Sequence, residues 1–160
     1  MFTVRPAESR DADAAVDVVR RSITELCTDD HRGDAETLAG WLANKTAQHF
    51  VTWLANEDNH CVIAETGSRL LGVGLLRRDG EVLLFFLSPE AQRRGIGTAI
   101  HAALEEKATA WGLPRLTLDS TFAARPFYER LGYRSTAAAR PRFGVLQSYP
   151  YEKTLGPAHL

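Results

Sequence analysis

Several features that would each suggest a particular class of protein are missing from this chain. Its 160 residues contain only two cysteines, Cys27 and Cys61, and these form no Cys-x-x-Cys pair. No apolar run approaches the roughly 20 residues of a membrane-spanning helix. The N-terminal Met-Phe-Thr-Val-Arg has neither the basic nor the apolar region of a secretory signal. We therefore expect a cytoplasmic protein with free thiols and no membrane association.

An excess of charge of either sign is also missing. The chain has 19 lysines and arginines against 20 acidic residues, so its formal net charge is −1. This balance argues against a surface for nucleic acid. No repeat, low-complexity segment or linker divides the sequence, and 160 residues suffice to bury one hydrophobic core. We expect a single domain over residues 1–160, as a monomer or a homodimer.

The middle of the sequence contains a strand–loop–helix stretch. Leu83–Leu87 is an unbroken apolar run, which predicts a strand buried on both faces. Pro89 ends the strand because proline cannot donate to the hydrogen-bond ladder. Gln92-x-x-Gly95-x-Gly97 then leads into a helical pattern of apolar residues. The glycines let a ligand approach the backbone and the helix start offers unpaired N–H groups, so the stretch predicts a phosphate or pyrophosphate site.

The pattern of glycines excludes two common phosphate sites. No Gly-Lys-Ser/Thr follows, so the loop is not a Walker A motif. The third glycine of the dinucleotide-binding fingerprint is also missing. Instead, the loop resembles the acyl-CoA loop of the GNAT N-acetyltransferases. A second segment, Ala124-Arg-Pro-Phe-Tyr-Glu-Arg-Leu-Gly-Tyr133, is similar to the Ala-x-x-Phe-Tyr-x-x-x-Gly-Phe segment of the same family.

The resemblance covers the chain from about Val62 onward and implies the fold of a small bacterial-type GNAT protein. This α/β (α+β) fold has a central mixed, mostly antiparallel sheet of about six or seven strands with helices on both faces. Residues 1–59 would supply a strand and the acceptor-side helices, and residues 60–155 the CoA-binding core and a C-terminal hairpin. The Leu83–Leu87 strand and the strand near Leu116 would be parallel neighbours that separate around the pantetheine arm.

The resemblance further implies that acetyl-CoA is the acyl donor. No metal is expected, because the spacing of Cys27, Asp29, Asp30 and His31 matches no structural zinc pattern. Backbone groups of the strand would pair with the pantetheine, and loop amides would hold the pyrophosphate. Arg93 or Arg94 would add positive charge, and Thr121 stands where many members have an asparagine that contacts the CoA arm. The expected donor-binding residues are Phe85, Phe86, Leu87, Gln92, Arg93, Arg94, Gly95, Ile96, Gly97, Thr98 and Thr121.

Acetyl transfer to an amine needs a group that protonates the departing thiolate and a group that takes a proton from the amine. By resemblance, Tyr128 is the proton donor. Glu81 is the expected base because it precedes Gly95 by fourteen residues, as the base does in histone-type members. It also shares a strand face with Phe85 if the strand keeps its register. Asp119 and a chain of water molecules are the alternatives.

The acceptor pocket is expected, by analogy with the family, between the first helices and the final hairpin. Its predicted residues are Cys27, Asp30, His31 and Trp41. Three carboxylates, Asp29, Asp30 and Asp34, lie in or beside a polar segment, residues 28–33, that we expect to be a loop, and they would attract a small cationic amine. The predicted reaction is direct attack by that amine in a ternary complex. A non-catalytic acyl-CoA-binding module and a protein or peptide N-acetyltransferase are the alternatives.

Overall fold

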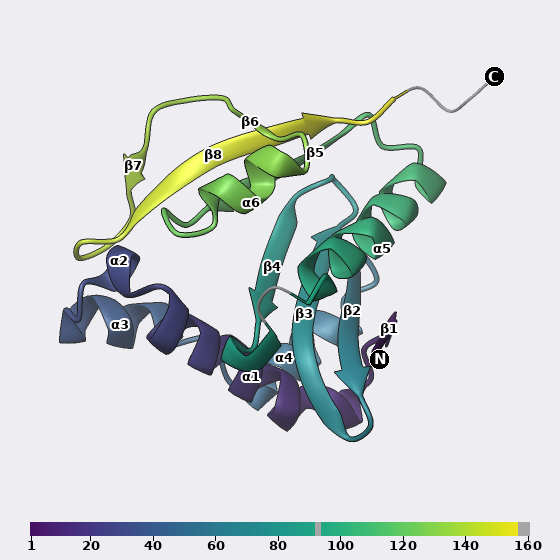
Figure 1. The fold of residues 1–160 in the computed structure, drawn as a ribbon, viewed down its shortest axis with the longest axis horizontal. Coiled ribbons are helices and arrows are strands. Elements are labelled where there is room, and N and C mark those ends of the chain that lie inside the picture. The colour runs from purple at the N-terminus through teal and green to yellow at the C-terminus, as the bar shows by residue number, and fades with distance from the viewer. Residues whose placement is uncertain (92–93, 157–160) are drawn as a thin grey trace.

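The computed structural model describes residues 1–91 and 94–156, so Gln92 and Arg93 of the predicted phosphate loop lie outside the described residues. The first part of the fold is an antiparallel sheet in the order β1-β2-β3-β4 (Figure 1). Its strands are β1 (Thr3–Pro6), β2 (Asn59–Thr66), β3 (Arg69–Arg77) and β4 (Val82–Leu87). The chain turns between β3 and β4 at Gly80, whose φ of 99° is one that other residues rarely adopt.

A second sheet is built around β8. Strands β5 (Arg115–Ser120) and β6 (Arg134–Ser135) pair antiparallel with β8 (Gln147–Thr154), and β7 (Arg140–Pro141) also pairs with β8. The two sheets meet where Glu81 and Thr117 form a parallel bridge, and the Thr117 N–H donates to the Gly80 carbonyl at 2.9 Å. Beyond this point β4 and β5 diverge (Figure 1). The predicted parallel neighbours therefore touch at one end only.

Helices cover both faces of the first sheet, as predicted. On one face, α1 (Ala12–Leu26) and α4 (Ala47–Ala55) enclose a core that includes Phe50 and Ile63. On the other face, α5 (Ile96–Ala110) buries Ile100 and Leu104 against β2 and β3. The remaining helical segments are η1 (Ser9–Asp11), α2 (Thr28–His31), α3 (Ala35–Leu42), η2 (Pro89–Ala91) and α6 (Arg125–Arg130). No helix of the described part of the chain is long and apolar enough to cross a membrane.

A β-bulge interrupts β4 near its start. Val82 lies opposite Leu76 and Leu84 lies opposite Leu75, so Leu83 has no opposite residue on β3. An extra residue of this kind breaks the alternation of side chains. Leu83 and Leu84 accordingly both pack in the core on the α1 side, whereas Phe85 packs on the α5 side. The sequence argument that placed Glu81 on the face of Phe85 assumed an unbroken register and does not hold.

The expected loop at residues 28–33 is partly helical. The N–H groups of Asp30 and His31 both donate to the Cys27 carbonyl, at 2.9 and 3.0 Å, and α2 is the single turn that results. The turn ends where Arg32 and Gly33 adopt positive φ values of 54° and 69°. The Asp30 and His31 side chains are buried, and their hydrogen bonds stabilise this turn; the polar character of the segment gave no sign of that burial.

Candidate active site

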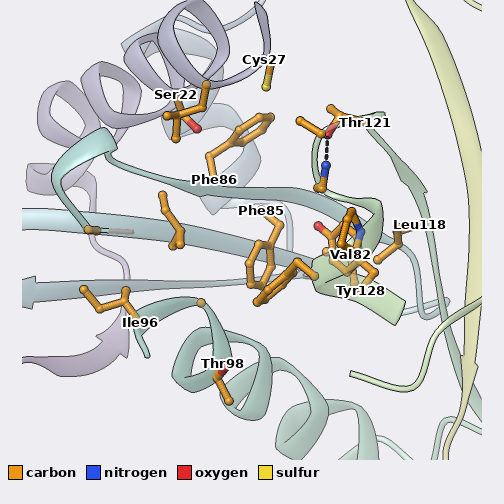
Figure 2. Close-up of a pocket in the computed structure, with 18 of the residues that line it drawn as sticks. Ser22, Cys27, Val82, Phe85, Phe86, Ile96, Thr98, Leu118, Thr121 and Tyr128 are labelled. Carbon is orange, nitrogen blue, oxygen red and sulfur yellow. Dashed lines mark hydrogen bonds between the residues drawn. The ribbon is translucent and has the colours of Figure 1, made fainter. Parts of the chain in front are cut away.

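A cleft of about 520 Å³ opens where β4 and β5 separate (Figure 2). Strand β4 and the first turn of α5 line one side of it. The end of α1, the end of β5, and α6 with the loop before it complete the wall. Of the residues predicted to bind the donor, the lining includes Phe85, Phe86, Leu87, Gly95, Ile96, Gly97, Thr98 and Thr121.

Strand β4 is the edge of its sheet and offers unpaired backbone groups to this cleft. Among residues 1–91 and 94–156, its far edge meets β5 only through the bridge between Glu81 and Thr117. Phe85, Phe86 and Leu87 are half-buried, so the expected strand buried on both faces instead has an exposed side toward the cleft. An edge strand of this kind can hydrogen-bond an extended ligand as a further strand would.

The start of α5 is open at one glycine and closely packed at the next. Gly95 is the N-cap residue with a φ of 77°, and a Cβ placed on it would have no heavy atom within 4 Å. Gly97 is buried, and a Cβ there would lie 3.1 Å from the ring of Phe127. Arg94 is exposed beside Gly95. The open N-terminus of this 15-residue helix, with a cation beside it, fits a pyrophosphate.

Tyr128 lines the cleft beside Val82 and Leu118 (Figure 2). The rings of Phe85, Phe127 and Tyr133 surround it at centroid distances of 5.3–5.9 Å. Only 5% of the residue is exposed, and burial raises the pKa of its hydroxyl. This phenol therefore stays protonated at neutral pH and can act as a proton donor.

A second cavity, of about 410 Å³, lies on the other side of β4. The loops after α3 and before β8 form much of its wall, together with Trp41 and Trp53. The two cavities share four lining residues, which are Leu83, Phe86, Asp119 and Thr121. The two cavities are therefore neighbours at these four residues.

A family model described as the acetyltransferase (GNAT) domain matches residues 27–155. The chain belongs to the GNAT acetyltransferase family. The match begins well before Val62, where the sequence resemblance was first apparent. Membership supports acetyl transfer from acetyl-CoA as the general reaction. No curated protein is similar enough in sequence to count as a relative of this GNAT protein.

Solved structures share the GNAT fold over nearly the whole chain. A GCN5-related N-acetyltransferase from Rhodopseudomonas palustris has a TM-score of 0.84 and 24% identity, with 96% of this chain and 95% of that chain covered. The PaiA N-acetyltransferase from Thermoplasma acidophilum in complex with coenzyme A has a TM-score of 0.80, 18% identity and coverage of 97% and 99%. The ribosomal-protein-S18-alanine N-acetyltransferase from Escherichia coli has a TM-score of 0.74, 18% identity and coverage of 99% and 97%. These similarities confirm the predicted fold class.

Glu81, the predicted base of the GNAT reaction, lies outside both cavities. Its carboxylate accepts a hydrogen bond from Arg77 at 2.8 Å, and its backbone forms the bridge to Thr117 where the two sheets meet. The bulge at Leu83 separates Glu81 from the face that the sequence argument assigned to it. Asp119, one of the alternatives, lines both cavities. Of these two carboxylates, only that of Asp119 belongs to the lining of the two cavities.

The structure separates the residues predicted for the acceptor pocket. Trp41 lines the second cavity, whereas Cys27 lines the donor cleft. Asp30 is only 5% exposed, and its carboxylate accepts hydrogen bonds from the N–H groups of Phe122 and Ala123 at 2.6 and 3.2 Å. It holds α2 against the loop before α6.

His31 and Asp34 are likewise used within the fold. The His31 ring lies 3.1 Å from the Thr24 carbonyl and accepts from the Gly33 N–H at 3.0 Å. Asp34 caps α3 through the Thr37 N–H at 3.0 Å. Neither residue lines either of the two cavities described above.

Proposed function

We propose that this GNAT protein is a single-domain enzyme over residues 1–160. It transfers an acetyl group from acetyl-CoA to the primary amine of a small molecule, by direct attack in a ternary complex. The observation that carries the proposal is the meeting of the two cavities at Leu83, Phe86, Asp119 and Thr121. A thioester at this junction would have its donor arm in the cleft and its carbonyl open to the second cavity.

The donor would bind mainly through the main chain. The free edge of β4 at Phe85–Leu87 suits the amides of pantetheine, and the N-terminus of α5 at Gly95 suits the pyrophosphate. The Thr121 Oγ1 already accepts from the Ala124 N–H at 3.1 Å, so its hydroxyl hydrogen is what it can offer to the pantetheine. This set of contacts recognises the shape of the donor and leaves the acyl group at the junction.

The attack would be a simple displacement. The amine nitrogen bonds to the thioester carbonyl carbon, and the proton that it loses passes to the Asp119 carboxylate or to water. The carbon–sulfur bond then breaks and sulfur leaves with the electron pair. The Tyr128 hydroxyl gives its proton to this sulfur and afterwards recovers one from solvent.

Cys27 lines the same cleft and raises the question of a covalent acetyl-cysteine step. Its thiol is buried, and burial together with the nearby Asp30 carboxylate raises its pKa to about 12. The thiolate is the nucleophilic form of cysteine, and it is scarce at neutral pH under these conditions. Direct attack by the acceptor amine is therefore the favoured route.

The proposal is tested by the release of free CoA thiol from acetyl-CoA in the presence of amines. The panel contains small amines of different charge and short peptides with free N-termini. Amine-dependent release with small amines supports the proposal. Binding of acetyl-CoA without release with any amine or peptide would identify a non-catalytic module, and release with peptides alone would identify a peptide acetyltransferase.

A further inference from the structure

We propose that the acceptor amine also carries an anionic oxygen group, a carboxylate or a phosphate, and that Lys45 and Arg142 bind this group in the second cavity. The inference rests on the proposed function, for which it names the class of acceptor. It also replaces the cationic acceptor that the acidic segment predicted, because that segment lines neither cavity.

Two positively charged side chains converge on the second cavity from segments far apart in the sequence. Lys45 lies between α3 and α4, and Arg142 lies just after β7. The Lys45 Nζ donates to the Asn44 Oδ1 at 2.6 Å and to the Trp41 carbonyl at 3.4 Å, and both of these acceptors are neutral. Among residues 1–91 and 94–156, neither cation has a carboxylate oxygen within 4.0 Å.

Several basic residues of the protein do have a carboxylate partner, whereas Lys45 and Arg142, like Arg20 and Arg125, have none among the described residues. Arg5, Arg21 and Lys153, for example, lie 2.6–2.9 Å from carboxylates. Burial and the nearby Arg142 charge lower the pKa of Lys45 to about 8. Two like charges at a partly dry site repel each other, and an anion between them would relieve that repulsion.

The same cavity also has an acidic residue, Asp119, whose carboxylate lies 3.5 Å from Arg140. Asp119, the acidic residue in the lining, lies at the junction with the donor cleft, where the amine would react. The lining also includes the aromatic residues Trp41, Phe86 and Phe143. The arrangement fits a molecule with an amine at one end, an apolar body and an oxygen anion at the other.

The backbone that carries the two cations is held before any ligand binds. The Arg20 side chain donates to the carbonyls of Leu42 and Lys45, both at 3.0 Å. The Thr37 Oγ1 accepts from the Val145 N–H at 2.9 Å and donates to Asp34 at 2.6 Å, which fastens the β7–β8 turn to α3. A preformed pair of cations of this kind reduces the ordering cost of binding an anion.

A binding experiment tests the anion site without requiring catalysis. Calorimetric titration with 3-phenylpropionate, which has the anion and the apolar body but no amine, is performed on the CoA-loaded protein and compared with titration of phenyl phosphate. We expect one or both to bind, and Lys45→Gln or Arg142→Gln to weaken that binding by about tenfold, as loss of a charge-assisted hydrogen bond does. Arg134→Gln, which removes an exposed arginine of β6 outside the cavity, should leave the affinity unchanged.

Turnover with two matched acceptors provides a second test of the anion site. 4-(Aminomethyl)phenylacetate and 4-methylbenzylamine share an amine and a ring and differ by the carboxylate at the far end, so the ratio of their kcat/KM values should favour the carboxylate-bearing amine and should fall in Lys45→Gln and Arg142→Gln. Failure of both anions to bind, or binding that neither variant weakens, would overturn the inference even if amines are acetylated. Anion binding that both variants weaken would support it even if no amine is acetylated, in which case the proposed function alone fails.

Discussion

Tyr128 is placed to donate a proton because its hydroxyl has no other task within the described fold. None of the hydrogen bonds among the described residues uses this hydroxyl, whereas that of Tyr133 lies 2.8 Å from His101 and that of Tyr151 donates to Glu129 at 2.6 Å. The three rings packed around Tyr128 fix its direction toward the cleft. Its place in the site can therefore be tested by removing one oxygen atom.

We expect Tyr128→Phe to lower kcat by roughly 100-fold, because the ring keeps its packing but the thiolate loses its acid. The affinity for acetyl-CoA should change little. The matched control is Tyr149→Phe, since Tyr149 lies on β8 and lines neither cavity. Steady-state kinetics and calorimetry on the two variants measure kcat and the affinity for acetyl-CoA. A Tyr128→Phe enzyme as fast as the parent would show that water protonates the CoA thiolate.

His101 shows a second effect of burial at a single residue. It is 2% exposed, and its ring nitrogens lie 2.8 Å from the Tyr133 hydroxyl and 3.5 Å from Glu105. Burial lowers its pKa from 6.5 to about 4, with the Lys153 charge adding to this and Glu105 opposing it. Between these two pH values the unfolded chain binds a proton that the folded chain does not, so stability falls as the pH falls through this window.

We therefore expect the free energy of unfolding to fall by about 2 kcal/mol between pH 7 and pH 5 on account of His101. His101→Gln can keep the hydrogen bond to Tyr133 but does not titrate, so its loss over the same interval should be smaller by about that amount. Urea unfolding of both proteins at the two pH values provides the measurement. Equal losses in parent and variant would show that His101 titrates alike in the folded and unfolded chains.

The start of α5 illustrates how an element's geometry prepares a binding surface. Gly95 combines a positive φ with open space around the position of a missing Cβ. Gly97, by contrast, is required by the close packing of Phe127. Both glycines belong to one motif in the sequence, yet only the first is open to an approaching ligand.

The open space around Gly95 leads to a prediction for Gly95→Ala, for which Gly33→Ala is the matched control. Both glycines have φ near +70° and open surroundings, so each alanine should destabilise the fold by roughly 1 kcal/mol through backbone strain. Only Gly95→Ala should also weaken CoA binding, because its methyl group would lie where the pyrophosphate approaches. Calorimetric titration of CoA and thermal unfolding of the two variants separate strain from ligand contact, and equal CoA affinities would place the pyrophosphate elsewhere.

At the scale of the whole molecule, local motifs could be predicted from the sequence, but long-range placement could not. The strand–loop–helix stretch and the Phe127-Tyr128 segment can be identified because the residues of each are contiguous in the sequence. The bulge at Leu83 was missed because Val82–Leu87 is uniformly apolar, and a one-residue shift in such a run leaves no trace in the pattern.

The acceptor side was predicted less well for a related reason. Asp30 appeared to be a surface charge, but its backbone partners, Phe122 and Ala123, lie some ninety positions further along the chain. Lys45 and Arg142 meet only because the β7–β8 turn packs on α3, and no spacing in the sequence signals that contact. Charge placement in this cavity follows from tertiary packing alone.

The central claim is that donor and acceptor occupy the two joined cavities at the same time, and the order of substrate binding tests it most directly. Initial rates of thiol release are measured while acetyl-CoA and the acceptor are both varied, and the protein is weighed by mass spectrometry after acetyl-CoA alone. We predict double-reciprocal lines that intersect, and an unmodified protein mass, because the amine attacks the thioester itself. Parallel lines together with an acetylated protein, lost in Cys27→Ser, would show a covalent intermediate and contradict the account.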